Sequence, residues 1–146
     1  VLREGTDGAL LAYGAMVYRC LQAAEKLSEK GIEVTVVNAR FVKPLDKELI
    51  LELIRNHKLI ITAEDHALMG GFGSAVLELV SDERENVNKI LRMGIPDCFI
   101  EHGPRNLMLK NIGLDEGGIA DKFITTLDLM NIRGSFTKTG KQRLSV

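Results

Sequence analysis

Short apolar runs alternate along this chain with longer stretches of helical periodicity, and this alternation limits the fold more than any other feature. The apolar runs are residues 9–13, 34–37, 59–63 and 90–93. Such runs are typical of strands that are covered on both faces of a parallel sheet. Strands that alternate with helices predict a three-layer α/β/α fold with a mostly parallel sheet. We expect about five strands, with residues 98–100 as a short fifth.

The expected helix boundaries coincide with residues that suit helix ends. An apolar stripe over residues 16–30 stops at Gly31, which fits the position just after a helix. Asp46 is expected to cap the second helix with its side chain. Gly73 opens the third helix, and two further helices close the domain, the second of them starting after Asp115.

The composition is that of an ordinary globular domain. The 146 residues are 45% hydrophobic and 27% charged, with 19 basic and 20 acidic side chains and a net charge of −1. This balance argues against nucleic acid or an anionic membrane as a partner, and no apolar run reaches the roughly 18–20 residues of a membrane span. We expect residues 1–130 to form one domain of a longer enzyme, and residues 131–146 to form a polar, poorly ordered tail.

The two cysteines, Cys20 and Cys98, are far apart in the sequence. Cys20 falls on the apolar face of the first predicted helix, so we expect a buried free thiol. A zinc site requires clustered cysteine or histidine ligands, and the sequence offers no such cluster.

A glycine-rich loop precedes the third predicted helix. Gly70, Gly71, Gly73 and Ser74 surround a helix start, where backbone N–H groups can hold a phosphate. The loop lacks the third glycine of a dinucleotide fingerprint and the lysine of a P-loop. Tight packing between loop and helix is therefore the favoured interpretation, and phosphate binding is the alternative.

Polar residues follow several of the predicted strands. Glu64, Asp65 and His66 come directly after the third strand, and a carboxylate beside a histidine can serve acid–base chemistry. Arg40 follows the second strand, and His102 lies in a Glu-His-Gly segment near residue 100. For all of these the favoured alternative is a structural contact, such as an ion pair or a polar loop at a domain or subunit interface. No Ser–His–Asp set or aromatic–basic patch occurs, so the sequence alone predicts no complete active site.

Several segments resemble the C-terminal domain of the 1-deoxy-D-xylulose-5-phosphate synthases, a family of transketolase-like enzymes. They are residues 38–46 (NARFVKPLD), 64–76 (EDHALMGGFGSAV), 95–103 (IPDCFIEHG) and 113–119 (GLDEGGI). The resemblance covers residues 1–130. Many members have Glu-Glu-Asn where this chain has Glu64, Asp65 and His66, which leaves the role of His66 open.

The resemblance implies an enzyme that condenses pyruvate with glyceraldehyde 3-phosphate, releases carbon dioxide and forms 1-deoxy-D-xylulose 5-phosphate. That product feeds isoprenoid, thiamine and pyridoxal synthesis. Thiamine diphosphate supplies the carbanion chemistry, with Mg²⁺ on its diphosphate. In this family the cofactor lies between the first two domains. The resemblance therefore implies no catalytic, cofactor-binding or metal-binding residue in this chain, and no cofactor bound to it alone.

The resemblance also implies partners. We expect contacts with the N-terminal and middle domains of the same enzyme and with a second subunit of a homodimer, served by Arg40, residues 64–66, the glycine loop and His102. The expected compartment is the bacterial cytosol, with a plastid as the alternative. Two other interpretations stay open: another transketolase-like enzyme, such as a transketolase or a 2-oxo acid dehydrogenase β subunit, and a free-standing phosphate- or nucleotide-binding module.

Overall fold

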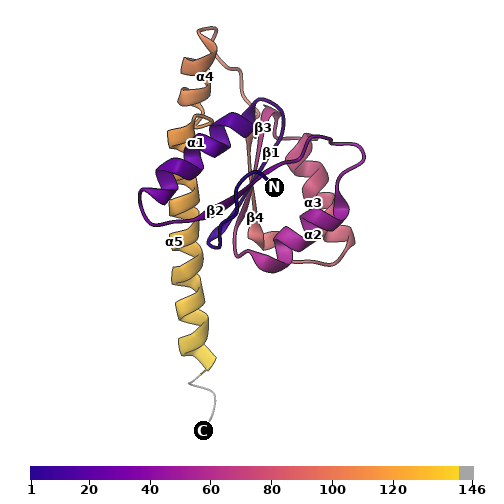
Figure 1. The fold of residues 1–146 in the computed structure, drawn as a ribbon, viewed down its shortest axis with the longest axis vertical. Coiled ribbons are helices and arrows are strands. Elements are labelled where there is room, and N and C mark those ends of the chain that lie inside the picture. Colours follow the sequence, from indigo (N-terminus) through magenta and orange to yellow (C-terminus); the bar gives the residue numbers. More distant parts are fainter. Residues whose placement is uncertain (142–146) are drawn as a thin grey trace.

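The computed structural model describes the backbone of residues 1–141 and the side chains of residues 1–131. Strands and helices alternate along the chain, as predicted (Figure 1). The strands are β1 (Gly8–Ala12), β2 (Val34–Asn38), β3 (Ile60–Ala67) and β4 (Ile90–Ile95). The helices are α1 (Met16–Ser28), α2 (Lys47–Asn56), α3 (Phe72–Asp82), α4 (Arg105–Asn111) and α5 (Glu116–Lys141), and the 3-10 helix η1 (Val87–Lys89) precedes β4. None of these helices is long and apolar enough to cross a membrane.

The four strands form one parallel sheet in the order β2-β1-β3-β4. The prediction of about five strands is therefore wrong by one, because residues 98–100 do not join the sheet. Pro96 has no amide hydrogen for a strand ladder, and the Cys98 N–H donates to the Pro96 carbonyl at 2.8 Å, which turns the chain away. Phe99 is consequently fully exposed.

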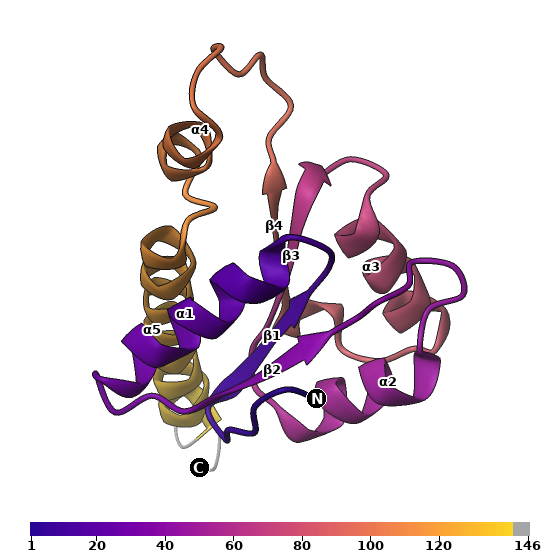
Figure 2. The ribbon, with the colours of Figure 1, turned by 45° about the horizontal axis from the view of Figure 1, so that its top comes forward.

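Helices cover both faces of the sheet, which confirms the three-layer prediction. Figure 2 shows α1 and α5 on one side of the strands and α2 and α3 on the other. The first pair packs around a core that includes Leu10 and Phe123. The second pair packs around a separate core that includes Leu11 and Ile54. Each strand buries residues on both faces, which accounts for the continuous apolar runs in the sequence.

Three residues occupy the places that the sequence predicts. The Asp46 side chain accepts a hydrogen bond from the Leu49 N–H at 3.1 Å and caps α2. Gly31 has φ of 76° just beyond α1, a left-handed conformation that glycine adopts without strain. Cys20 is a buried free thiol, and its burial raises the pKa of the thiol to about 12.

The strand β3 is longer than predicted, because the chain continues in the sheet past a bulge. The pairing of β3 with β4 shifts register between Ala63 and Ala67. A bulge re-aims side chains, and here Glu64 is buried while Asp65 and His66 are exposed.

All four strands are parallel, so their carboxyl ends meet at one edge of the sheet, which we call the carboxyl edge. The loops that leave it are residues 13–15, 39–46, 68–71 and 96–104. The helix α4 stands beyond this edge, at the top of the view in Figures 1 and 2.

The closing helix α5 runs from Glu116 to Lys141. The predicted domain boundary at residue 130 falls inside it and stays a prediction. The predicted tail also includes residues 142–146, which lie outside the described residues.

Candidate functional site

A buried carboxylate organises the glycine loop at the carboxyl edge. The Glu64 side chain is fully buried. One of its oxygens accepts a hydrogen bond from the Phe72 N–H at 2.6 Å, and the other accepts one from the Gly73 N–H at 2.8 Å. These N–H groups begin α3, where the helix dipole favours a negative charge. The position at which an external phosphate would bind is thus filled by a carboxylate of the chain itself.

The glycines of the loop make room for this carboxylate. A Cβ atom on Gly71 would collide with the Glu64 carboxylate and with the Ala67 carbonyl. A Cβ atom on Gly94 would lie 3.0 Å from the Glu64 Cγ atom, and one on Gly73 would lie 2.6 Å from the Thr62 hydroxyl. The glycine pattern is therefore explained by close internal packing.

A second set of polar contacts holds the same loop from the side of β4. The Arg92 guanidinium donates to the Leu68 carbonyl at 2.9 Å and to the Ser74 hydroxyl at 2.7 Å. The Ser74 hydroxyl donates to the same Leu68 carbonyl and accepts from the Gly70 N–H. Sequence reasoning did not single out Arg92. A charged residue inside an apolar strand was the signal that could have identified it.

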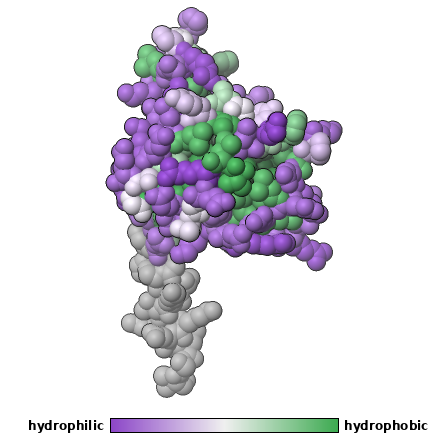
Figure 3. All heavy atoms as spheres, in the orientation of Figure 1, coloured by the Kyte–Doolittle hydropathy of each residue, from purple (hydrophilic) through white to green (hydrophobic). Residues whose placement is uncertain are grey.

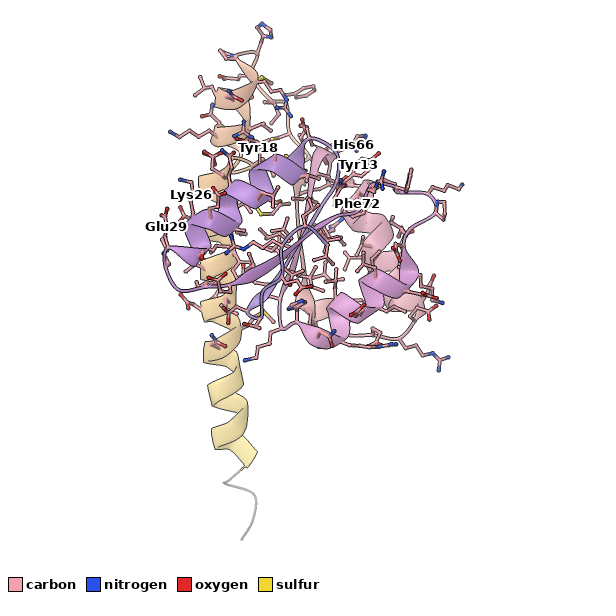
Figure 4. The ribbon with its side chains drawn as sticks, viewed as in Figure 1. Tyr13, Tyr18, Lys26, Glu29, His66 and Phe72 are labelled. Atoms are coloured by element: carbon pink, nitrogen blue, oxygen red, sulfur yellow. The ribbon has the colours of Figure 1, made fainter. Side chains whose placement is uncertain are left out.

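Of the two exposed polar residues of the bulge, Asp65 contacts the helix α4. The Asp65 carboxylate accepts a hydrogen bond from the Arg105 guanidinium at 2.5 Å. His66 is exposed, and its ring Nδ1 lies 3.4 Å from the neighbouring Ala67 carbonyl. Nearby, the rings of Tyr13 and Phe72 stack with centroids 5.5 Å apart, and Figure 4 labels them with His66. Asp65 thus fastens α4 to the sheet, and no contact of His66 defines a catalytic pair among residues 1–131.

Arg40 and His102 lie apart from this cluster. Arg40 follows β2, which the strand β1 separates from β3. It has φ of 59°, and its N–H donates to the Asn38 side chain at 3.0 Å. Its guanidinium carbon lies 5.9 Å from the centre of the Phe41 ring. His102 is exposed in the loop of residues 96–104. The structure therefore brings Glu64, the glycines and Ser74 together, and leaves Arg40 and His102 at separate places on the carboxyl edge.

The charged groups of this region suit internal contacts better than a metal or cofactor. Within residues 1–131, no three His, Cys, Asp or Glu side chains converge as ligands for a metal ion. Two orphaned buried polar atoms among these residues, the Thr62 hydroxyl and the His57 Nδ1, lie on different elements and do not form a shared cradle.

One concave apolar surface lies beside the glycine loop. It is a groove of about 380 Å³ lined by residues 67–69 and 95–99. Met69 and Phe99 flank it, and both are exposed. The walls are mainly apolar, so the groove suits a hydrophobic side chain better than a phosphate.

Comparison with known proteins identifies relatives along most of the chain. Residues 1–119 match the family described as "Transketolase, C-terminal domain". A protein of Geobacter sulfurreducens named 1-deoxy-D-xylulose-5-phosphate synthase 1 is 53% identical over 120 residues, which are 82% of this chain and 19% of that protein. A Synechococcus protein named 1-deoxy-D-xylulose-5-phosphate synthase is 48% identical over 135 residues, which are 92% of this chain and 21% of that protein. The chain thus spans about a fifth of the length of the curated relatives it matches.

Solved structures show the same fold. A structure titled "Split gene transketolase, inactive beta4 tetramer" has a TM-score of 0.81 and 34% identity, and the match covers 89% of this chain and 42% of that one. A transketolase of Pichia stipitis has a TM-score of 0.65 over 90% of this chain and 18% of its own, at 17% identity, which shows the fold alone. From the matched family and the shared fold we conclude that the chain belongs to the transketolase C-terminal domain family.

Proposed function

We propose that this chain is the C-terminal domain of a 1-deoxy-D-xylulose-5-phosphate synthase. The observation that carries the proposal is the 53% and 48% identity, over most of the chain, to two proteins of that name. The whole enzyme condenses pyruvate with glyceraldehyde 3-phosphate and releases carbon dioxide. Thiamine diphosphate and Mg²⁺ supply the carbanion chemistry there, in the part of the enzyme that precedes this domain.

The role of this domain in the enzyme is support rather than chemistry. The internal contacts of its polar residues favour this role: Glu64 binds the first N–H groups of α3, Asp65 binds Arg105, and Arg92 binds the glycine loop. Groups that are held in this way keep loops in place and are poorly suited to exchange protons with a substrate.

The partners follow from the same proposal. The N-terminal and middle domains of the enzyme contact this domain through Arg40, the exposed Asp65 and His66, the glycine loop and His102, and a second subunit completes a homodimer. The relative whose title describes a β4 tetramer supports self-assembly, since this chain matches that structure at 34% identity. The enzyme acts in the bacterial cytosol.

A second candidate for the function of the whole enzyme is a transketolase. It is supported by the same 34% identity to a chain titled as a split gene transketolase. An assay of the whole enzyme with thiamine diphosphate and Mg²⁺ separates the two. Product from pyruvate and glyceraldehyde 3-phosphate alone establishes the synthase. Activity only with xylulose 5-phosphate and ribose 5-phosphate moves the function to transketolase.

The supporting role has a direct test at His66. Because its side chain is exposed and makes only a long contact with a neighbouring carbonyl, His66→Ala in the whole enzyme is expected to leave kcat nearly unchanged, as is the matched control His102→Ala. A catalytic acid or base contributes roughly 100- to 10,000-fold. A loss of kcat of that size in His66→Ala, with unchanged thermal stability, would show that the domain takes part in the chemistry.

A further inference from the structure

Exposed apolar side chains are concentrated at the carboxyl edge. Large apolar residues with exposed side chains lie in or next to every loop there. Phe41, Met69 and Phe99 lie in the loops after β2, β3 and β4, Tyr18 lies in the first turn of α1, and Leu107 lies on α4. At the opposite edge the exposed large apolar residues of the described part are Val87, before β4, and Leu129, near the amino ends of β3 and β4. Clusters of exposed apolar side chains mark interaction surfaces, whereas single ones are ordinary.

The most exposed of these residues border the apolar groove. Phe99 is fully exposed and Met69 is 71% exposed, and both line a groove of about 380 Å³. Asp97 and Glu101 lie beside Phe99 in the same loop and are exposed to solvent. An apolar centre with charged residues around it is the usual arrangement of a protein–protein contact.

The direction of the first residues indicates what approaches this edge. Residues 1–5 run along the outer side of β2 in the opposite direction to that strand, with an antiparallel bridge between Arg3 and Val36. The Leu2 N–H donates to the Val36 carbonyl at 2.8 Å, and the Val36 N–H donates to the Arg3 carbonyl at 2.9 Å. A polypeptide that leads into Val1 therefore arrives from the carboxyl end of β2, next to the loop that carries Arg40 and Phe41.

The surface near this point is apolar as well. Val1 and Leu2 are both more than half exposed. Figure 3 shows hydrophobic atoms gathered between α1 and the pair α2 and α3, on the side of the molecule where the N-terminal segment lies along the edge strand β2. Apolar surface thus continues from the N-terminal segment toward the carboxyl edge.

We infer that the carboxyl edge is the face on which this domain packs against the preceding part of the same polypeptide, with Phe41, Met69 and Phe99 buried in the contact. This inference rests on one part of the proposed function, namely that this domain follows the other domains of a longer enzyme. The tether at Val1 holds the preceding segment at a high effective concentration beside this edge. That advantage favours an intrachain contact over one with a second copy.

Hydroxyl-radical footprinting of the whole enzyme tests the inference. For each side chain, the labelling rate in the unfolded enzyme is divided by the rate in the folded enzyme, so that intrinsic reactivities cancel. Phe41, Met69 and Phe99 are expected to be protected about tenfold or more, and the matched controls Val87 and Leu129 less than about threefold. Labelling of the three edge residues at the rate of the controls would overturn the inference.

A pair of variants decides which partner covers the edge. Phe99→Asp in the whole enzyme is expected to raise the labelling of Met69 severalfold and to leave the sedimentation behaviour unchanged, while Leu129→Asp changes neither. If Phe99→Asp changes the number of subunits in the assembly, the edge is a contact between copies and the inference is wrong. Unchanged labelling of Met69 in this variant also overturns it.

These measurements do not depend on the reaction. Protection of the edge in an enzyme that makes no 1-deoxy-D-xylulose 5-phosphate would support the docking surface and refute the proposed function. Formation of 1-deoxy-D-xylulose 5-phosphate by an enzyme whose carboxyl edge is unprotected would support the proposed function and refute the docking surface.

Discussion

Glu64 joins the end of β3 to the start of α3 through a single side chain. Its two oxygens accept hydrogen bonds from two N–H groups that no turn of α3 can satisfy. The carboxylate is fully buried, so in the intact chain these two N–H groups are satisfied by Glu64 rather than by bulk water. Glu64, one of the three polar residues considered for acid–base chemistry, thus caps α3 from the preceding strand.

Removal of this side chain is expected to destabilise the domain. Glu64→Ala leaves two buried N–H groups without a partner, which costs about 3 kcal/mol or more in the free energy of unfolding. Glu64→Gln keeps one acceptor oxygen and is expected to cost about half as much. Urea unfolding of the chain measures both.

The control is Asp65→Asn, which alters a surface ion pair worth about 1 kcal/mol at most. If Glu64→Ala costs no more than this control, the carboxylate does not hold the start of α3.

His57 makes stability depend on pH. It caps the carboxyl end of α2 with its backbone N–H, which donates to Leu53, while its side chain is buried. That burial, aided by the nearby positive charge of Lys89 and partly opposed by a contact with the Thr6 backbone, lowers the pKa of the imidazole below its usual 6.5. The cap of α2 is thus made by the main chain of His57 and not by its side chain.

The sign of the pH effect follows from proton binding. Below about pH 6.5 the unfolded chain takes up a proton at His57 that the folded chain does not, so the free energy of unfolding falls as the pH decreases toward the lower folded pKa. His57→Gln is expected to flatten the thermal midpoint between about pH 7.5 and pH 5.5, and the exposed control His102→Gln is expected to keep the wild-type slope. An unchanged slope in His57→Gln would assign the pH dependence to other groups.

At the scale of single elements, the cap of α2 can be tested in isolation from the site. Asp46→Ala removes the hydrogen bond to the Leu49 N–H and is expected to lower the free energy of unfolding by about 1 kcal/mol. Asp46→Asn keeps an acceptor oxygen and is the matched control, with a loss of a few tenths of a kcal/mol. Equal losses in the two variants would mean that the charge, rather than the cap, stabilises the helix.

The elements that the sequence predicted well are those set by local patterns. The apolar runs of β1 to β4, the stripe of α1 and the cap at Asp46 depend on residues close together in the chain, and all are confirmed. The predicted fifth strand at residues 98–100 failed because strand pairing depends on a neighbour, and the turn after Pro96 removes that neighbour.

In the candidate site, too, the positions of residues in the sequence were predictable and their contacts across the fold were not. The sequence placed Glu64 directly after the third strand and the glycines around the start of the next helix, and the structure brings the two together. The hydrogen bonds from the start of α3 to the Glu64 carboxylate could not be predicted, because they depend on the path of the loop that joins β3 to α3. Arg92 was missed for the same reason, because its partners Leu68 and Ser74 approach it through tertiary packing.

The whole molecule has two unlike edges. The cores are closed between the sheet and its two helix layers, and the carboxyl edge retains exposed aromatic and apolar side chains. On the α5 side, the last fully buried residue within residues 1–131 is Phe123, and Ile124, Leu127 and Met130 pack partly against the core. Packing of the described side chains thus extends to the predicted boundary at residue 130.

The position of the buried residues along α5 predicts the effect of shortening the chain. Deletion of residues 131–146 removes none of the core residues named above, so the free energy of unfolding is expected to change by less than about 1 kcal/mol. The contrast is Phe123→Ala, which empties a site buried between α5 and β1 and is expected to cost about 3–5 kcal/mol. Urea unfolding of the two variants and the intact chain provides the comparison. If the deletion costs as much as Phe123→Ala, residues beyond 130 belong to the folded domain, and the boundary must move toward the end of α5.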